Sequence, residues 1–249
     1  MKLSRKQRER ILSLLPSFLK KIRYNEQKGK MSELSYKDEF IYDRGIFSKL
    51  KGGYSQYGQD LFIYKMLMNQ KKEGFFLDIG GNDPIEINNS FLFEKNGWSG
   101  LAFEPVSSLA KKWENTRETE CLNIALGDEE CEVQFVEDGA LSGIRESGKY
   151  GSDNVDNKYI VKQRKLSNVL AERGITDVDV MFIDVEGFEM RVLQGIDFDV
   201  VEISVICLEN NEDSDLKADM SIRKFLIEKG YRLIGRLTID DIFVKDNFL

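Results

Sequence analysis

The sequence predicts an α/β domain with a mostly parallel sheet, helices on both faces and a closing antiparallel hairpin. Short apolar runs alternate with helical segments from residue 54 onward, a pattern typical of a parallel sheet. The first run, 74–79, breaks into Gly80-Gly81, as at the ligand-binding carboxyl edge of such a sheet. The last two runs, 231–237 and 241–245, are so close in the sequence that they must pair antiparallel.

The first half of the domain is expected to begin with a helix. Ser55 followed by amides and a carboxylate is typical of a helix start, and apolar positions continue to about Asn69. The next apolar run contains aromatic residues, which favours a buried parallel strand over 75–79. The remaining elements of this half are a helix over 90–96, a strand over 100–104, a helix over 107–116, a strand over 121–125 and a further strand or hairpin arm over 131–137.

The second half opens with a polar, glycine-rich stretch, 138–158. A loop of this length inside a compact domain is usually functional or disordered, and we expect it to border the substrate. Further on, Gly195 is typical of a helix C-terminus. The expected elements before the closing hairpin are a helix over 166–173, a strand over 178–183, a helix over 189–194, a strand over 203–208 and a helix over 221–229.

The composition restricts both the chemistry and the partners. The chain has 249 residues, a net charge of −7 and no histidine, so acid–base work is left to Asp, Glu, Lys or Tyr. Basic residues gather in the first 30 positions, and the acidic remainder is not expected to bind nucleic acid. No stretch approaches the ~20 apolar residues of a membrane span and no signal-peptide core is visible, so we expect a cytoplasmic protein. Cys121, Cys131 and Cys207 lack metal-ligand spacing and are expected to be buried, reduced thiols.

We expect a helical N-terminal extension over 1–53 and a ligand-binding domain over 54–249. Residues 4–24 form a basic amphipathic segment in which Pro16 predicts a kink or break. Three interpretations of this segment stay open: packing on its own domain or on a second subunit of a homo-oligomer, peripheral contact with an anionic membrane, and substrate capture. Residues 25–52 are expected to form a loosely helical linker or lid.

Acidic side chains mark the ends of two neighbouring predicted strands. Asp78 stands just before Gly80-Gly81, and Glu104 ends the next strand, where an acid typically accepts the hydroxyls of an adenosine ribose. Two carboxylates leave little room for a pyrophosphate, and the turn lacks the G-x-G-x-x-G spacing, so a dinucleotide fits less well. A ligand with ribose hydroxyls and a cationic centre fits better, and S-adenosylmethionine is the common one. A strand-Gly-Gly turn without Glu104 would indicate only a tight corner.

Four ordered motifs resemble the FkbM family of class I S-adenosylmethionine-dependent methyltransferases. The motifs are Ser55-Gln56-Tyr57-Gly58-Gln59-Asp60, Phe76-Leu77-Asp78-Ile79-Gly80-Gly81-Asn82-Asp83-Pro84, Phe91-Leu92-Phe93-Glu94-Lys95-Asn96-Gly97-Trp98-Ser99-Gly100 and Phe182-Ile183-Asp184-Val185-Glu186-Gly187-Phe188-Glu189. The resemblance covers 54–249 and implies a Rossmann-like methyltransferase domain over that range. Asn82 replaces the third glycine of the general class I turn, as is usual for the family, whereas Asn88-Asn89-Ser90 stands where Ser-Asn-Thr is expected.

The resemblance implies a set of cofactor-binding residues. Those nearest the first two strands would shape the cofactor turn and hold the ribose, and they are Asp78, Gly80, Asn82, Glu104 and Pro105. Asp128 would lie near the adenine. Those near the methionine end or the substrate would be Gln56, Gln59 and Asp60, although Gln59 and Asp60 have helix capping as an alternative role.

The resemblance also implies that Asp184, as a further cofactor contact, and Glu186 face the transferred methyl group. Glu189 has an alternative role as a first-turn acid favoured by the helix dipole. Without histidine, two routes to deprotonate an acceptor hydroxyl stay open. In the first, Asp184 or Glu186 is the base, its pKa raised by burial.

The second route uses a cation. Asp184, Glu209 and Asn210 are similar in type and separation to the set that holds magnesium in catechol O-methyltransferases, and all-oxygen ligands suit Mg²⁺. A bound cation would acidify the hydroxyl. The alternative is that these side chains only accept hydrogen bonds from the backbone or the substrate.

The predicted function is therefore O-methylation of a hydroxyl on a sugar or another small polar metabolite, the usual acceptors of the family, for example in surface glycan or natural-product biosynthesis. Two other classes stay open. A non-catalytic nucleotide-binding subunit would bind the cofactor and turn nothing over. An NAD-dependent oxidoreductase is disfavoured by the spacing of the turn.

Overall fold

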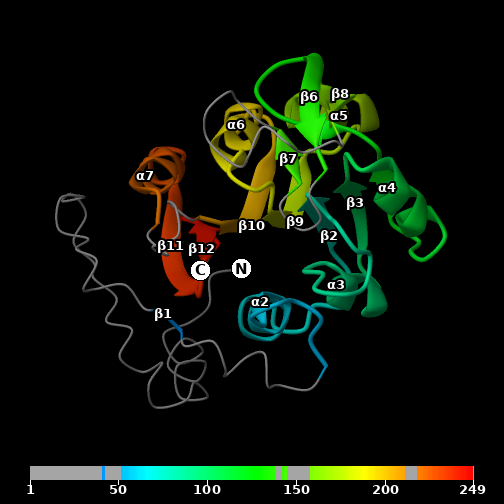
Figure 1. The fold of residues 1–249 in the computed structure, drawn as a ribbon. Coiled ribbons are helices and arrows are strands. Elements are labelled where there is room, and N and C mark those ends of the chain that lie inside the picture. Colours follow the sequence, from blue (N-terminus) through cyan, green and yellow to red (C-terminus); the bar gives the residue numbers. More distant parts are fainter. Residues whose placement is uncertain (1–40, 43–51, 138–141, 145–157, 211–217, 249) are drawn as a thin grey trace, which may run out of the picture.

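The computed structural model describes residues 41–42, 52–137, 142–144, 158–210 and 218–248 (Figure 1). The basic amphipathic segment 4–24 lies outside the described residues, as does most of the predicted linker 25–52. Within that linker, Ile41–Tyr42 form the short strand β1 rather than part of a helix, because they pair with the edge of the main sheet. Among the helices of the described ranges, none is long and apolar enough to cross a lipid bilayer.

The main sheet has eight strands in the order β1-β11-β12-β10-β9-β2-β3-β4. The bounds of the strands after β1 are β2 Phe75–Ile79, β3 Ser99–Phe103, β4 Glu120–Leu122, β9 Asp177–Ile183, β10 Glu202–Glu209, β11 Tyr231–Leu237 and β12 Asp240–Lys245. From β10 through β4 every pair is parallel, whereas β12 runs antiparallel to both β10 and β11. The predicted parallel sheet and closing hairpin are both confirmed.

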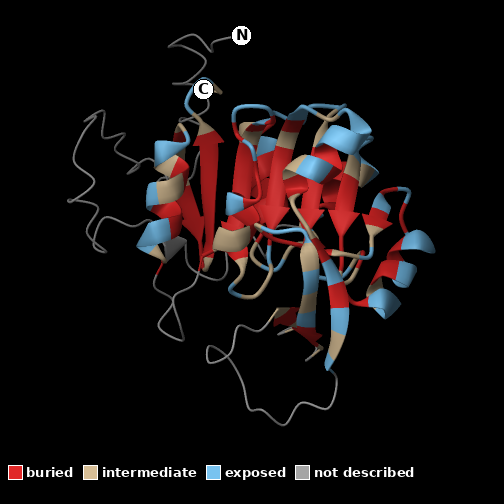
Figure 2. Cartoon of the chain, turned by 90° about the horizontal axis from the view of Figure 1, so that it is seen from above, coloured by how far each residue is buried: buried red, intermediate tan, exposed pale blue. Residues whose placement is uncertain are grey.

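Helices cover both faces of this sheet (Figure 1). Alternate strand residues point to opposite faces, so Leu77 and Met181 contribute to one hydrophobic core, while Phe76 and Phe182 contribute to the other. The first core packs against α5 Leu166–Arg173, α6 Glu189–Gln194 and α7 Met220–Glu228. The second packs against α2 Gln59–Phe62, the π-helix η4 Ile63–Leu67 and α3 Phe91–Lys95. Figure 2 shows the resulting buried layer of strands, with exposed residues on the outer helices.

The first helix is shorter than predicted. It begins at Gln59 rather than Ser55, because the Ser55 hydroxyl and the Tyr54 amide both donate to the Asp60 carboxylate at 2.6 Å and hold the preceding residues in a bend. Gly58 completes this bend with a φ of 85°, a conformation that favours glycine. Beyond Phe62 the helix widens into η4, which ends at Leu67 rather than Asn69.

A second sheet, β5-β8-β6-β7, was only partly predicted. Its strands are β5 Ala125–Leu126, β6 Cys131–Val136, β7 Gly143–Ile144 and β8 Lys158–Arg164. The predicted strand 121–125 is wrong as one element, since its first part pairs with β3 in the main sheet and its end pairs with β8. The hairpin arm at 131–137 is confirmed by β6. The sequence did not predict β8, because only two of its seven residues, Val161 and Gln163, are buried.

The helix after β3 and the state of the cysteines also agree with the sequence predictions. The helix expected over 107–116 is α4 Ser107–Glu114, and it packs Ala110 and Trp113 onto the sheet next to Ala102 of β3. All three cysteines are free thiols, as predicted, although Cys131 is only partly buried.

Candidate active site

A pocket opens at the carboxyl ends of β2, β3 and β9, where the sequence predicted a ligand. It holds about 670 Å³ of empty space, a figure that includes open solvent at its mouth. Polar and glycine residues on its wall include Gly80, Asn82, Glu104, Ser142, Gly143, Asp184 and Glu186. Its apolar residues include Ile79, Phe103, Leu109, Ala125, Leu126, Phe135, Ile144 and Phe188. The pocket therefore joins an apolar, aromatic wall to a carboxylate-rich end.

The turn after β2 needs glycine at its first position. Gly80 has a φ of 80°, and a Cβ there would lie 1.8 Å from the carbonyl oxygen of Asp184, which follows the neighbouring strand β9. Any side chain would force the two strand ends apart. Asn82, two residues on, also has a positive φ of 42°, a region that Asn tolerates better than most residues.

Glu104, just past β3, is tied to this turn. One carboxylate oxygen accepts a hydrogen bond from the Asn82 amide at 2.8 Å, and the other accepts one from the Val106 amide at 2.7 Å. Burial raises the pKa of Glu104 to about 7, against these two hydrogen bonds, which lower it. Each oxygen keeps a lone pair for a ligand hydroxyl, and Pro105 lines the pocket beside it.

Three further carboxylates lie close together, and two of them, Asp184 and Glu186, line the other end of the pocket. Ligand atoms of Asp184, Glu186 and Glu209 all lie within 4.8 Å of one another. Part of the Asp184 side chain faces the pocket. Burial of its carboxyl group by the surrounding protein raises its pKa well above the usual range, and the nearby Glu209 carboxylate raises it further. Burial first, then neighbouring carboxylates, raise the pKa of Glu186 and of Glu209 to about 7. The two carboxylates of Asp184 and Glu209 influence each other's titration, so they titrate as a coupled pair.

This carboxylate cluster predicts an unusual pH dependence of stability. A carboxyl whose pKa is higher in the folded chain than in the unfolded chain stabilises the fold below its unfolded pKa and loses that contribution as the pH rises through its folded pKa. The pKa values of Glu186 and Glu209 rise from 4.5 to about 7 on folding, so the free energy of unfolding should fall between pH 5 and pH 8. Urea denaturation of Glu209→Gln should give a flatter profile than the wild-type chain. If the stability of the variant and of the wild-type chain changes equally with pH, the raised pKa of Glu209 is contradicted.

A family model described as the methyltransferase FkbM domain matches residues 78–233, more than half of the chain. The chain belongs to the FkbM methyltransferase family. No protein with a curated description matches it. The part of the chain matched by the FkbM domain includes the cofactor turn, Glu104 and all three clustered carboxylates, so the pocket lies within the family's shared region.

Of the predicted metal set Asp184, Glu209 and Asn210, which stays a prediction for this FkbM domain, Asn210 differs in its surroundings from the two carboxylates. The Asn210 side chain is fully buried and committed to the protein, because its oxygen accepts from the Asp219 amide and its nitrogen donates to Asp241. Glu186 joins Asp184 and Glu209 as the third carboxylate of the cluster. Its backbone φ of 53° lies in the left-handed region, which is strained for a residue other than glycine.

The predicted residues of the first motif lie outside the pocket wall of the FkbM domain. Gln56 is exposed, and Asp60 holds the bend before α2, although no side chain caps that helix. Gln59 is buried and donates to Asp240 at 2.6 Å. Asp240 carries a pKa raised to about 8 by burial and then by Asp184, so Gln59 reaches the carboxylate end indirectly. The sequence did not single out Asp240, because it lies at the tip of the closing hairpin, for which only antiparallel pairing was predicted.

Asp78 and Asp128 also lie off the pocket wall. Asp78 is buried behind the turn and accepts hydrogen bonds from Ser90 and Asn88, which fits its predicted role of shaping the turn. Asp128 follows β5 and pairs with Arg191 at 2.6 Å, in a hollow next to the pocket. Glu189 accepts from the Val185 and Gly187 amides and so fixes the loop that carries Glu186.

Proposed function

We propose that this FkbM protein is an S-adenosylmethionine-dependent O-methyltransferase that acts on a hydroxyl of a sugar or another small polar metabolite. The observation that carries the proposal is one pocket lined by the Gly80 turn, by Glu104 and, at its other end, by Asp184 and Glu186. We also infer a class I, Rossmann-like sheet, which the parallel strands β10-β9-β2-β3-β4 and the antiparallel hairpin support.

The residues of the pocket fit the cofactor. Glu104 presents a carboxylate to ribose hydroxyls, and the wall of Phe103, Leu109, Phe135 and Ile144 suits a flat aromatic base. When bound, S-adenosylmethionine supplies an electrophilic methyl group on a cationic sulfur. The acidic end of the pocket favours that positive charge and, in our proposal, orients the acceptor for in-line attack.

The carboxylate cluster would remove the proton of the acceptor hydroxyl. Asp184 and Glu186 line the pocket, and burial raises the pKa of both; the value of about 7 for Glu186 suits a carboxylate that takes a proton near neutral pH. The same three carboxylates offer the oxygen ligands that a hard divalent cation prefers, so Asp184, Glu186 and Glu209 would hold Mg²⁺ if the reaction uses one. A cation there would lower the pKa of the bound hydroxyl.

Glu104 provides the first test. Glu104→Gln should weaken S-adenosylmethionine binding by about 10-fold or more, since charged hydrogen bonds contribute roughly 1.5–3 kcal/mol each. Because the pKa of Glu104 is about 7, wild-type affinity should also fall as the pH drops from 8 to 6, whereas the variant should show no such slope. Isothermal titration calorimetry measures both effects. Glu114→Gln, an exposed acid on α4, is the matched control. Equal affinities for all three proteins would move the ribose contact away from Glu104.

A further inference from the structure

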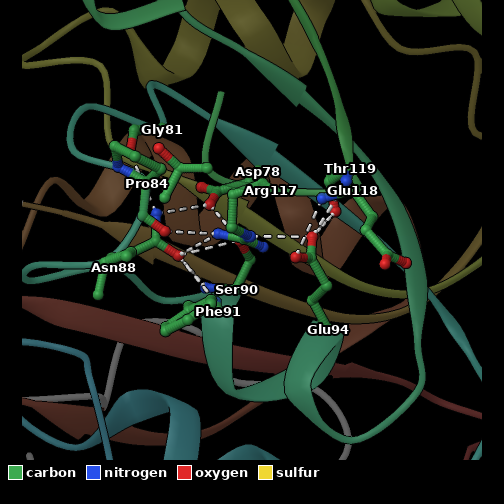
Figure 3. A network of polar contacts seen from close by, with 12 residues as sticks. Asp78, Gly81, Pro84, Asn88, Ser90, Phe91, Glu94, Arg117, Glu118 and Thr119 are labelled. Carbon is green, nitrogen blue, oxygen red and sulfur yellow. Dashed lines mark hydrogen bonds and ion pairs between the residues drawn. The ribbon is translucent and has the colours of Figure 1, made fainter. Parts of the chain in front are cut away.

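A buried polar cluster lies directly behind the cofactor turn (Figure 3). We call it the Arg117 cluster, and its side chains are Asp78, Asn88, Ser90, Glu94 and Arg117. Asp78, Asn88, Ser90 and Arg117 are each no more than 7% exposed. Asn88 and Ser90 stand where the family pattern has Ser and Thr. The resemblance to the family therefore assigns these two residues no role.

Asn88 connects the cluster to the turn. Its amide nitrogen lies 3.1 Å from the carbonyl oxygens of both Gly81 and Asp83, the two neighbours of Asn82. The same nitrogen lies 3.2 Å from the Asp78 carboxylate. Asn82 lines the pocket and donates its own amide to Glu104, so Asn88 fixes the backbone on both sides of a pocket residue.

Arg117 holds Asn88 and the rest of the segment in place. Its guanidinium donates to the Pro84 carbonyl at 2.7 Å, to Asn88 Oδ1 at 3.3 Å and to Ser90 Oγ at 3.2 Å. It also lies 2.9 Å from the Glu94 carboxylate in an ion pair. Only the planar fork of an arginine can serve this many acceptors at once. Since the group is buried, these contacts are stronger than they would be in water.

A second contact connects Arg117 to the same turn. The guanidinium stacks over the ring of Trp113, with a distance of 4.4 Å to its centroid. The Trp113 indole nitrogen donates to the Asn82 carbonyl at 2.8 Å. Asn82 and Ile87, both residues other than glycine, have positive φ values of 42° and 53° within this segment. Such strained conformations persist only where the surroundings hold them, and the Arg117 cluster provides that support.

We propose that Arg117 is a positioning residue for cofactor binding, which acts through Asn88, Ser90 and Trp113 to hold the turn at Asn82 in its ligand-binding conformation before the ligand arrives. A turn that is already ordered loses less entropy on binding, so its affinity is higher. This inference rests on the proposed function, because it concerns the affinity of the same pocket for S-adenosylmethionine.

The test compares binding with folding. Arg117→Ala should raise the dissociation constant of S-adenosylmethionine by about 10-fold or more, a coupling within the usual range between linked sites. Isothermal titration calorimetry is performed well below each melting temperature, so that only folded protein is measured. Arg117→Lys should not recover the affinity, whereas millimolar methylguanidinium added to Arg117→Ala should recover part of it. Arg164→Ala is the matched control, because Arg164 also bridges two glutamates but lies on the second sheet away from the turn.

Each outcome bears on one of the two claims. If the wild-type chain does not bind S-adenosylmethionine, the proposed function is wrong and this inference goes with it. If the wild-type chain binds and Arg117→Ala binds equally well, the inference alone is overturned. Should Arg117→Ala not fold, Ser90→Ala provides the decision, because it removes one hydroxyl that donates to Asp78 and accepts from Arg117. An unchanged dissociation constant for folded Ser90→Ala would overturn the inference, and an increase of several-fold supports it.

Discussion

Asp241→Ala should lower the free energy of unfolding by about 3–5 kcal/mol, the cost typical of breaking a buried ion pair from one side. Asp241 is fully buried and accepts hydrogen bonds from Arg223 at 2.7 and 2.9 Å, and from Arg236 at 2.9 Å. It also accepts from Asn210 at 2.7 Å. Both arginines are 1% exposed, so removing Asp241 takes a shared carboxylate away from two buried positive charges. Urea denaturation followed by circular dichroism measures the loss.

Glu228→Ala is the matched control for Asp241→Ala. Glu228 also pairs with a basic residue of α7, Lys224, but both side chains are more than 60% exposed and their charged atoms are 3.9 Å apart. Such a pair contributes less than about 1 kcal/mol. If the two variants lose similar stability, the buried hydrogen bonds that Asp241 accepts from Arg223, Arg236 and Asn210 do not stabilise the fold as expected.

Asp184→Asn should lower kcat by about 10²–10⁴-fold at saturating cofactor, the contribution expected of a positioned proton acceptor. An amide cannot take a proton from the acceptor hydroxyl, and it weakens any cation site formed with Glu186 and Glu209. The measurement is single-turnover transfer of a labelled methyl group. Asp177→Asn, at the opposite end of β9, is the control and should keep wild-type rates.

Chelation separates the two explanations of a loss in Asp184→Asn. If the carboxylates act directly as a base, EDTA leaves wild-type turnover unchanged. If they hold a cation, EDTA abolishes turnover and added Mg²⁺ restores it. A variant with wild-type kcat would remove Asp184 from the chemistry altogether.

Much of the fold could be predicted because local patterns and the sheet agreed. Apolar runs such as 75–79 and 203–208 are long and bounded by turn residues, so their strands were found with small boundary errors. β8 could not be found this way, since only Val161 and Gln163 of its seven residues are buried. The first helix was misplaced because Ser55 donates to Asp60 rather than capping a helix.

The sequence predicted the positions of site residues best where each residue directly follows the end of a predicted strand. Gly80, Asn82, Glu104, Asp184 and Glu186 all line the same pocket, because parallel strands end at a common edge. The hydrogen bonds of Asn210 with Asp219 and Asp241, which lie 9 and 31 residues away in the sequence, could not be predicted. Contacts between such distant positions depend on the tertiary structure. The hydrogen bonds and the ion pair of the Arg117 side chain join it to residues 23 to 33 positions earlier in the sequence, so the sequence patterns could not predict them for the same reason.

A crystal structure of the full chain soaked with S-adenosylhomocysteine tests the central claim most directly. We predict that the ribose hydroxyls contact Glu104, that the base lies against Phe135 and Ile144, and that the sulfur end lies beside Gly80 and Asp184. Electron density for the nucleoside at any other place on the protein, with the pocket at β2 and β3 empty, would contradict the account.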